Sequence, residues 1–180
     1  MSLVSFSARN HPQQAVRDAI DDRGTRRDFF DPLNAEHRFT LDAAASDANH
    51  LCAHYYTRET DGLLCSWRAE RVWCNPPYSR LEPWVAKAWF EMRNGCDRVV
   101  MLLPANRCEQ GFWQRWVEPY RDTGPDAAGI SLHSRFLSGR MRFVMPEDFT
   151  YYTTRAKGDR PPFGCVLLTW SHALDGEDGE

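Results

Sequence analysis

Apolar residues between positions 79 and 117 form two stripes with helical spacing, separated by one continuous run. The run, residues 98–104, is typical of a strand buried on both faces of a parallel sheet. The stripe before it predicts a helix that begins near Ser79 and ends at Gly95. The residues that start at Ser79 have the spacing of a capping box. The two stripes consist of Trp84, Val85, Ala88, Trp89 and Met92, then Phe112, Trp113, Trp116 and Val117. A buried strand between amphipathic helices indicates an α/β fold.

The start of the chain predicts less regular elements. A helical pattern opens at Asn10 and ends at Gly24, and residues 25–28 have the spacing of a capping box. Pro32 lies too deep for an unbroken helix to follow. We therefore expect a short turn that restarts with Asp31 as its cap and Pro32 at its first position.

Further strands are predicted on both sides of the central run. Residues 37–42 predict the first core strand, and residues 46–67 are too short and too polar for a full strand-helix-strand unit. Residues 129–133 predict a strand, residues 136–143 predict a hairpin, and residues 163–170 predict the last strand. We expect a mixed, mostly parallel sheet with helices on both faces, a C-terminal antiparallel hairpin and an abbreviated N-terminal half.

The length of 180 residues, with 42% apolar residues, fits one globular domain over residues 1–170 and an acidic flexible tail over 171–180. The formal net charge of the chain is −3, and the tail alone contributes four negative charges, so the rest of the chain is nearly neutral. Arg far outnumbers Lys, which suits contacts with phosphate or guanine. A GC-rich genome also enriches Arg without a functional reason, so charge alone leaves an ordinary acidic protein equally open.

The cysteines and histidines do not predict a metal site. The six cysteines lack C-x-x-C spacing, and we expect them to be reduced thiols of the core. His50, Cys52 and His54 are close in sequence but lack a second ligand pair at zinc spacing. The sequence shows no signal peptide, apolar run of about 18 residues or lipidation motif, so we expect a soluble, cytoplasmic protein with no membrane partner.

Residues 72–78 place an unusual loop at the end of a strand. Residues 72–74 favour an extended strand, and the prolines at 76 and 77 each fix φ and remove an N–H group. The strand must therefore end at Asn75. The loop presents an amide side chain, free carbonyls and the Tyr78 ring at the carboxyl edge of a sheet, where open α/β folds bind ligands. This combination suits an amino group attached to a flat ring.

The Asn-Pro-Pro-Tyr loop resembles the catalytic loop of the amino-methyltransferases. With its flanks, the chain resembles the compact phage-type DNA adenine N6-methyltransferases (the Dam family) from about Thr25 to about Trp170. The resemblance implies a Rossmann-like methyltransferase domain, S-adenosylmethionine as methyl donor, no metal, and double-stranded DNA as partner, in the bacterial host cytoplasm if a phage encodes the chain. The matching segments are residues 39–45, 55–57, 61–63 and 72–79.

The resemblance also implies site residues. Those expected at the cofactor are Thr25, Phe29, Asp42, Ala43, Ala44, Asp61 and Asn75. Two departures from the family stand here: Arg26 replaces a usual proline, and alanines follow Asp42 where distant relatives have a glycine-rich turn. A helix-capping role for Asp42 and a turn role for Asp61 are the structural alternatives.

The expected chemistry rests on residues 75–78. The adenine N6 lone pair is delocalised, so the Asn75 side-chain carbonyl and the Pro76 backbone carbonyl would accept its hydrogens as positive charge develops. Pro77 would stiffen the loop, and Tyr78 would stack on an adenine flipped out of the duplex. A double-proline turn with a buried tyrosine is the structural alternative.

Residues 138–162 are expected to form a loop that contacts DNA. The basic residues expected there or beside it are Arg135, Arg140, Arg142, Arg155 and Lys157. An ordinary mobile loop is equally compatible with this segment. Two other functions also remain open: methylation of RNA or of a protein glutamine amide by the same loop, and a catalytically silent relative that binds nucleic acid.

Overall fold

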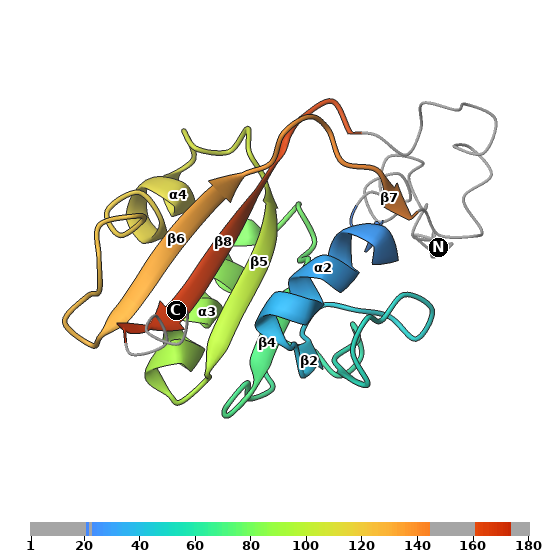
Figure 1. The fold of residues 1–180 in the computed structure, drawn as a ribbon, viewed down its shortest axis with the longest axis horizontal. Coiled ribbons are helices and arrows are strands. Elements are labelled where there is room, and N and C mark those ends of the chain that lie inside the picture. Colours follow the sequence, from blue (N-terminus) through green and yellow to red (C-terminus); the bar gives the residue numbers. More distant parts are fainter. Residues whose placement is uncertain (1–20, 22, 145–160, 174–180) are drawn as a thin grey trace, which may run out of the picture.

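A six-stranded sheet forms the centre of the computed structural model, which describes residues 21, 23–144 and 161–173 (Figure 1). Its strands are β2 (Leu41–Asp42), β3 (His54–Tyr55), β4 (Arg71–Cys74), β5 (Arg98–Pro104), β6 (Ile130–Phe136) and β8 (Cys165–His172). They lie in the order β3-β2-β4-β5-β8-β6. β3, β2, β4 and β5 are parallel, whereas β8 is antiparallel to both β5 and β6. The sheet is therefore mixed, with one strand opposed to the others, and its β4 lies in a central position.

Helices cover both faces of this sheet, as predicted. They are α2 (Arg27–His37), α3 (Leu81–Arg93) and α4 (Gly111–Trp116). Because successive side chains of a strand point to opposite faces, Val99 and Met101 of β5 pack in one apolar cluster with α3 and α4, while Val100 and Leu102 pack in another with α2. In Figure 1, α2 lies in front of the sheet and α3 behind it.

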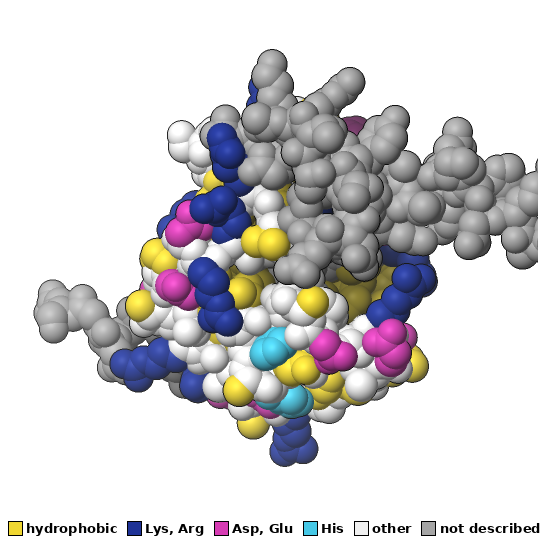
Figure 2. Space-filling model, turned by 90° about the vertical axis from the view of Figure 1, so that its right-hand side faces the viewer, with side chains coloured by type: hydrophobic (Ala, Val, Ile, Leu, Met, Phe, Trp, Pro, Cys, Tyr) yellow, Lys and Arg dark blue, Asp and Glu magenta, His cyan; other side chains and the backbone are white. Residues whose placement is uncertain are grey.

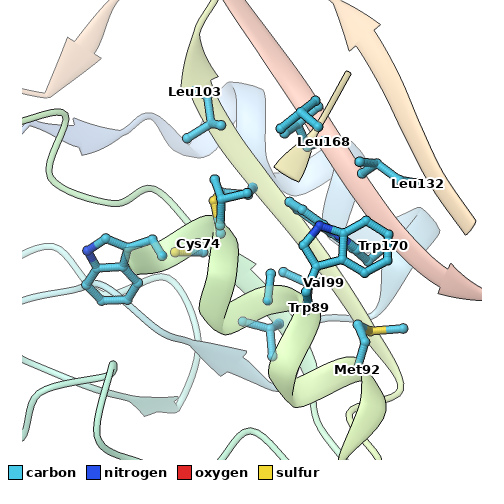
Figure 3. Packing of buried hydrophobic residues seen from close by; sticks show 14 of the residues in the cluster. Cys74, Trp89, Met92, Val99, Leu103, Leu132, Leu168 and Trp170 are labelled. Atoms are coloured by element: carbon cyan, nitrogen blue, oxygen red, sulfur yellow. The ribbon is translucent and has the colours of Figure 1, made fainter. Parts of the chain in front are cut away.

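The α3 side of the core is built around large aromatic residues (Figure 3). The Trp89 ring meets the Trp170 ring of β8 edge-on, with 6.1 Å between ring centroids. The Trp89 indole N–H donates to the Trp116 carbonyl at 2.8 Å, which joins α3 to α4. The apolar stripe of residues 84–92 is buried here, so the prediction of this helix is confirmed. All six cysteines are free; four of them are buried core thiols as predicted, whereas Cys65 and Cys108 are only half-buried.

The first helix after residue 25 differs from the prediction, because α2 continues through Pro32. Proline removes one helical hydrogen bond and costs roughly 3 kcal/mol in a helix interior. The carbonyl it leaves unpaired belongs to Asp28 on an exposed turn, where water can bond it. Burial of Phe30 and Leu33 against the sheet contributes about 1.5–3 kcal/mol each and offsets the proline. The helix begins at Arg27 and its N-cap, Arg26, makes no side-chain cap bond, so the predicted capping box and the restart at Asp31 are wrong.

Three predicted boundaries also change. His37 ends α2, and Arg38 in the left-handed region reverses the chain, so the first core strand is only Leu41–Asp42. The capping box at Ser79 is absent, because Arg80 is the N-cap of α3 and makes no side-chain cap bond. β8 extends to His172, so the tail cannot begin at residue 171; residues 174–180 lie outside the described residues.

The predicted hairpin over residues 136–143 is wrong in its pairing. β7 (Phe143–Val144) pairs antiparallel with β1 (Gly24–Thr25) in a separate two-stranded sheet. The antiparallel neighbour of β6 is β8, which follows much later in the chain. Between β2 and β4 the chain forms only turns and the two-residue β3, so the abbreviated crossover is confirmed.

Candidate active site

A cavity lies at the edge where β2 and β4 end. Parallel strands place their carboxyl ends together, and this edge is where open α/β sheets bind ligands. The cavity measures about 470 Å³ and is lined by residues that follow each strand, among them Ala43, Ala44, Asn75 and Pro77, and by Asp61. Four residues expected at the cofactor are thus brought together: Ala43, Ala44, Asp61 and Asn75.

The Asn75 side chain is held in one orientation. Its Nδ2 donates to the backbone carbonyl of Arg23 at 2.8 Å. A carbonyl can only accept, so this bond identifies the amino side of the amide and leaves Oδ1 on the other side. Oδ1 is buried and has no hydrogen-bond partner in the described part of the chain. An unpaired buried acceptor costs about 1–3 kcal/mol, so it marks a position that a ligand donor would satisfy.

The Tyr78 ring packs among aromatic side chains beside the loop. Its centroid lies 6.3 Å from that of Phe143, edge-on, and 6.0 Å from that of Phe163. Burial raises the pKa of the Tyr78 hydroxyl well above its usual value, so the group stays neutral. The next residue, Ser79, is held by Asp21, whose carboxylate accepts both its backbone N–H, at 3.0 Å, and its hydroxyl.

Sequence reasoning missed Asp21 and Arg23, the two residues that hold the loop from the start of the chain. Asp21 is 58 positions from Ser79, and Arg23 is 52 positions from Asn75. Arg23 is only 8% exposed, and its Nε is buried without a hydrogen-bond partner among the described residues. Nothing local in the sequence pairs these positions, since the contacts exist only once the chain has folded.

Asp42 lies at the end of β2 but does not line the cavity. Its carboxylate accepts the backbone N–H of Leu51 at 3.1 Å, and its backbone carbonyl accepts the N–H of Tyr56 at 2.9 Å. Burial raises the pKa of this carboxyl from 3.8 to about 6, against the lowering effect of the N–H bonds from Leu51 and Ala44. Asp42 thus ties the turn after β2 to the segment around β3.

Two other expected cofactor residues lie away from the cavity lining. Thr25 belongs to β1, where its hydroxyl is buried without a partner among the described residues. Phe29 packs in the α2 side of the core.

The Asp61–Gly62 turn lies directly against the turn after β2. Asp61 has φ 55°, and its carboxylate accepts the Leu63 N–H at 3.0 Å. The Gly62 carbonyl accepts the Trp67 indole N–H at 2.9 Å. A Cβ on Gly62 would lie 2.1 Å from the Ala43 carbonyl oxygen, so only glycine allows this close approach. The wall of the cavity therefore depends on a residue without a side chain.

The residues expected to contact DNA are only partly described. Arg135 is exposed on β6, and Arg140 and Arg142 are exposed between β6 and β7. Arg155 and Lys157 lie outside the described residues. On the face drawn in Figure 2, described basic side chains lie at several places among acidic and apolar ones.

Among the described residues, no group of three His, Cys, Asp or Glu side chains is arranged to hold a metal ion. None of the helices in that same part of the chain is long and apolar enough to cross a membrane.

A mixed α/β sheet with this cavity at its edge is compatible with a methyltransferase fold. Residues 11–159 match the family described as DNA N-6-adenine-methyltransferase (Dam), and the chain belongs to that family. It is similar to the DNA N-6-adenine-methyltransferase of Escherichia phage T1, with 33% identity over 153 residues, which cover 79% of this chain and 62% of the relative. The DNA N-6-adenine-methyltransferase of Haemophilus phage HP1 is 35% identical over 75 residues, covering 42% of this chain and 43% of the relative. The matches span less than two thirds of either relative.

Proposed function

We propose that the protein transfers a methyl group from S-adenosylmethionine to N6 of an adenine in double-stranded DNA. The observation that carries this proposal is the buried, unpaired Oδ1 of Asn75 in the wall of the cavity. The family and the names of both phage relatives support the same reaction.

The cavity has the features that the cofactor requires. Its volume of about 470 Å³ lies within the range of roughly 300–1,000 Å³ found for small-molecule sites. Ala43, Ala44 and Asp61 would hold the cofactor, and Asn75 lines the same cavity; when bound, the cofactor supplies a methyl group on a positively charged sulfur. The strand order, with β8 alone antiparallel to its neighbours, supports the finer assignment of a Rossmann-like methyltransferase sheet.

The chain's own contribution is to accept hydrogen bonds and to align the amino group. Asn75 Oδ1 would accept one N6 hydrogen and the Pro76 carbonyl the other, which favours a localised lone pair on the nitrogen. Because Arg23 holds the amide from behind, this acceptor needs no reorganisation during the reaction. Neither acceptor is a strong base, which suits a reaction whose other partner already carries positive charge.

DNA contact is proposed for the exposed arginines as well. Arg135 and Arg140 lie on the strand and loop that lead from β6 towards β7, and Phe143 of β7 packs against the Tyr78 ring. Phosphate contacts in this region would therefore lie near the reacting loop. A base flipped from the duplex would reach Tyr78 from the same side.

The test is transfer of labelled methyl groups from S-adenosylmethionine to unmethylated double-stranded DNA, followed by nuclease digestion and identification of the nucleoside. We expect N6-methyladenine, and we expect Asn75→Ala to lower kcat by about 100-fold or more while cofactor binding stays within a few-fold. Asn94→Ala, on the exposed end of α3, is the matched control. Normal turnover by Asn75→Ala would refute the mechanism.

The same assay separates the other readings. Label in RNA or in a glutamine side chain, with none in DNA, would assign the loop to another amide or amine. If the wild-type protein does not bind S-adenosylmethionine, this would indicate a catalytically silent relative that binds nucleic acid.

A further inference from the structure

A second cavity lies beside the Pro-Pro-Tyr loop. It measures about 510 Å³ and is lined by Tyr78 from the loop after β4 and by Arg107 and Gln110 from the connection between β5 and α4. Ser79 and Arg80 line both this cavity and the one described above. The two cavities therefore share residues of the reacting loop, and the first of them is already assigned to the proposed cofactor.

Arg107 is the distinctive group of this second cavity. Its Nε is buried and has no hydrogen-bond partner among the described residues. Nε and the adjacent Nη form the side-on fork with which a guanidinium binds two oxygens of a phosphate or carboxylate. A buried donor without an acceptor costs about 1–3 kcal/mol, and an anionic oxygen would remove that cost.

The backbone around Arg107 is held in place. The Arg107 carbonyl accepts the N–H of Gln110 at 3.1 Å, and the Cys108 carbonyl accepts the amide of Gln114 at 2.7 Å. The charged residues that line the cavity are two arginines, Arg80 and Arg107, and one acidic residue, Glu82. Its charge is therefore positive overall, which favours an anion.

We propose that Arg107 binds a backbone phosphate of the DNA strand that carries the target adenine, next to the base stacked at Tyr78. This inference rests on the proposed function and adds to it a residue that fixes the nucleotide in the second cavity, which shares Ser79 and Arg80 with the cavity proposed for the cofactor. A phosphate held by Arg107 would restrict the sugar and base, so that the amino group faces Asn75. Arg107 is in this sense a positioning residue rather than a catalytic one.

The test compares Arg107→Ala and Arg107→Lys with Arg115→Ala, which removes an exposed arginine whose guanidinium lies over Trp116 on α4. Binding of a fluorescein-labelled, unmethylated duplex is measured over a series of salt concentrations, together with methyl transfer and cofactor affinity. We expect Arg107→Ala to reduce the slope of log K against log salt by about 0.9, the value for one phosphate contact. We also expect at least tenfold lower kcat/KM for DNA and unchanged cofactor affinity.

Arg107→Lys should keep the salt slope, because the charge remains, but recover only part of kcat/KM, because the fork is lost. A slope for Arg107→Ala equal to those of wild type and Arg115→Ala would overturn the inference. DNA binding is read without turnover, so the two proposals fail separately. If wild type methylates no DNA, the proposed function fails, whereas an unchanged slope beside normal wild-type methylation removes only the role of Arg107.

Discussion

Gly62→Ala tests whether the cavity wall depends on the contact between two turns. The added Cβ would lie 2.1 Å from the Ala43 carbonyl oxygen, whereas such atoms essentially never approach closer than 3.0 Å. One of the two backbone segments must therefore move by about 0.9 Å or more. Both segments line the proposed cofactor site, through Ala43 and Ala44 on one side and Asp61 on the other.

The expected loss of stability has two parts. Overpacking in a close contact costs about 1–3 kcal/mol. Movement of the Gly62 carbonyl also weakens its 2.9 Å bond from the Trp67 indole, and Trp67 is fully buried. An unsatisfied buried N–H adds about 1–3 kcal/mol. The sum, about 2–6 kcal/mol, corresponds to a Tm lower by roughly 4–24 °C for a chain of this length.

The assay is thermal unfolding together with calorimetric titration of S-adenosylmethionine. We expect the Tm to fall as above and cofactor affinity to fall by at least tenfold. Gly111→Ala is the control, because a Cβ on Gly111 meets no atom within 4 Å. A Gly62→Ala protein with wild-type Tm and cofactor affinity would refute the reasoning about the wall.

Two further predictions concern charge. The pKa of Asp42 is raised from 3.8 to about 6, so the protonated carboxyl contributes stability that is full below pH 4 and is lost as the pH rises through about 6. This loss in the free energy of unfolding is about 3 kcal/mol. It should be absent in Asp42→Asn when the free energy of unfolding in urea is measured from pH 4 to 7. Parallel pH profiles for the variant and wild type would contradict this prediction. Replacing both Arg135 and Arg140 by Gln should weaken DNA binding and reduce the slope of log K against log salt by the amount expected for up to about two phosphate contacts. An unchanged slope would exclude both residues as phosphate ligands.

The parts of the fold with strong local periodicity were predictable from the sequence. The apolar stripe of α3 and the continuous run of β5 each carry their own signal over many residues, and the structure confirms both. The Asn-Pro-Pro-Tyr loop was predictable for the same reason, since Pro76 and Pro77 restrict the backbone whatever surrounds them. Its position beside Ala43 and Asp61 followed from the family resemblance.

The parts that depend on contacts far apart in the chain were not predictable. The pairing of β1 with β7 joins two-residue strands, too short to show alternation. The bonds from Asp21 and Arg23 to the loop, and the unpaired donor of Arg107, exist only in the folded chain. Pro32 misled the prediction because burial of the residues around it outweighs its local cost.

The position of β8 has a consequence for biosynthesis. β8 is the last strand of the sheet to leave the ribosome, yet it lies between β5 and β6 and pairs with each of them over seven residues. Until β8 emerges, one edge of β5 has unpaired backbone N–H and C=O groups, and the side chains of β5 are strongly apolar. Such an edge associates readily with other chains. Synthesis proceeds at about 5–20 residues per second, so the interval between the emergence of β5 and that of β8 lasts for seconds. The sheet can close only when synthesis has passed His172, so one edge of β5 stays without its partner strand until then.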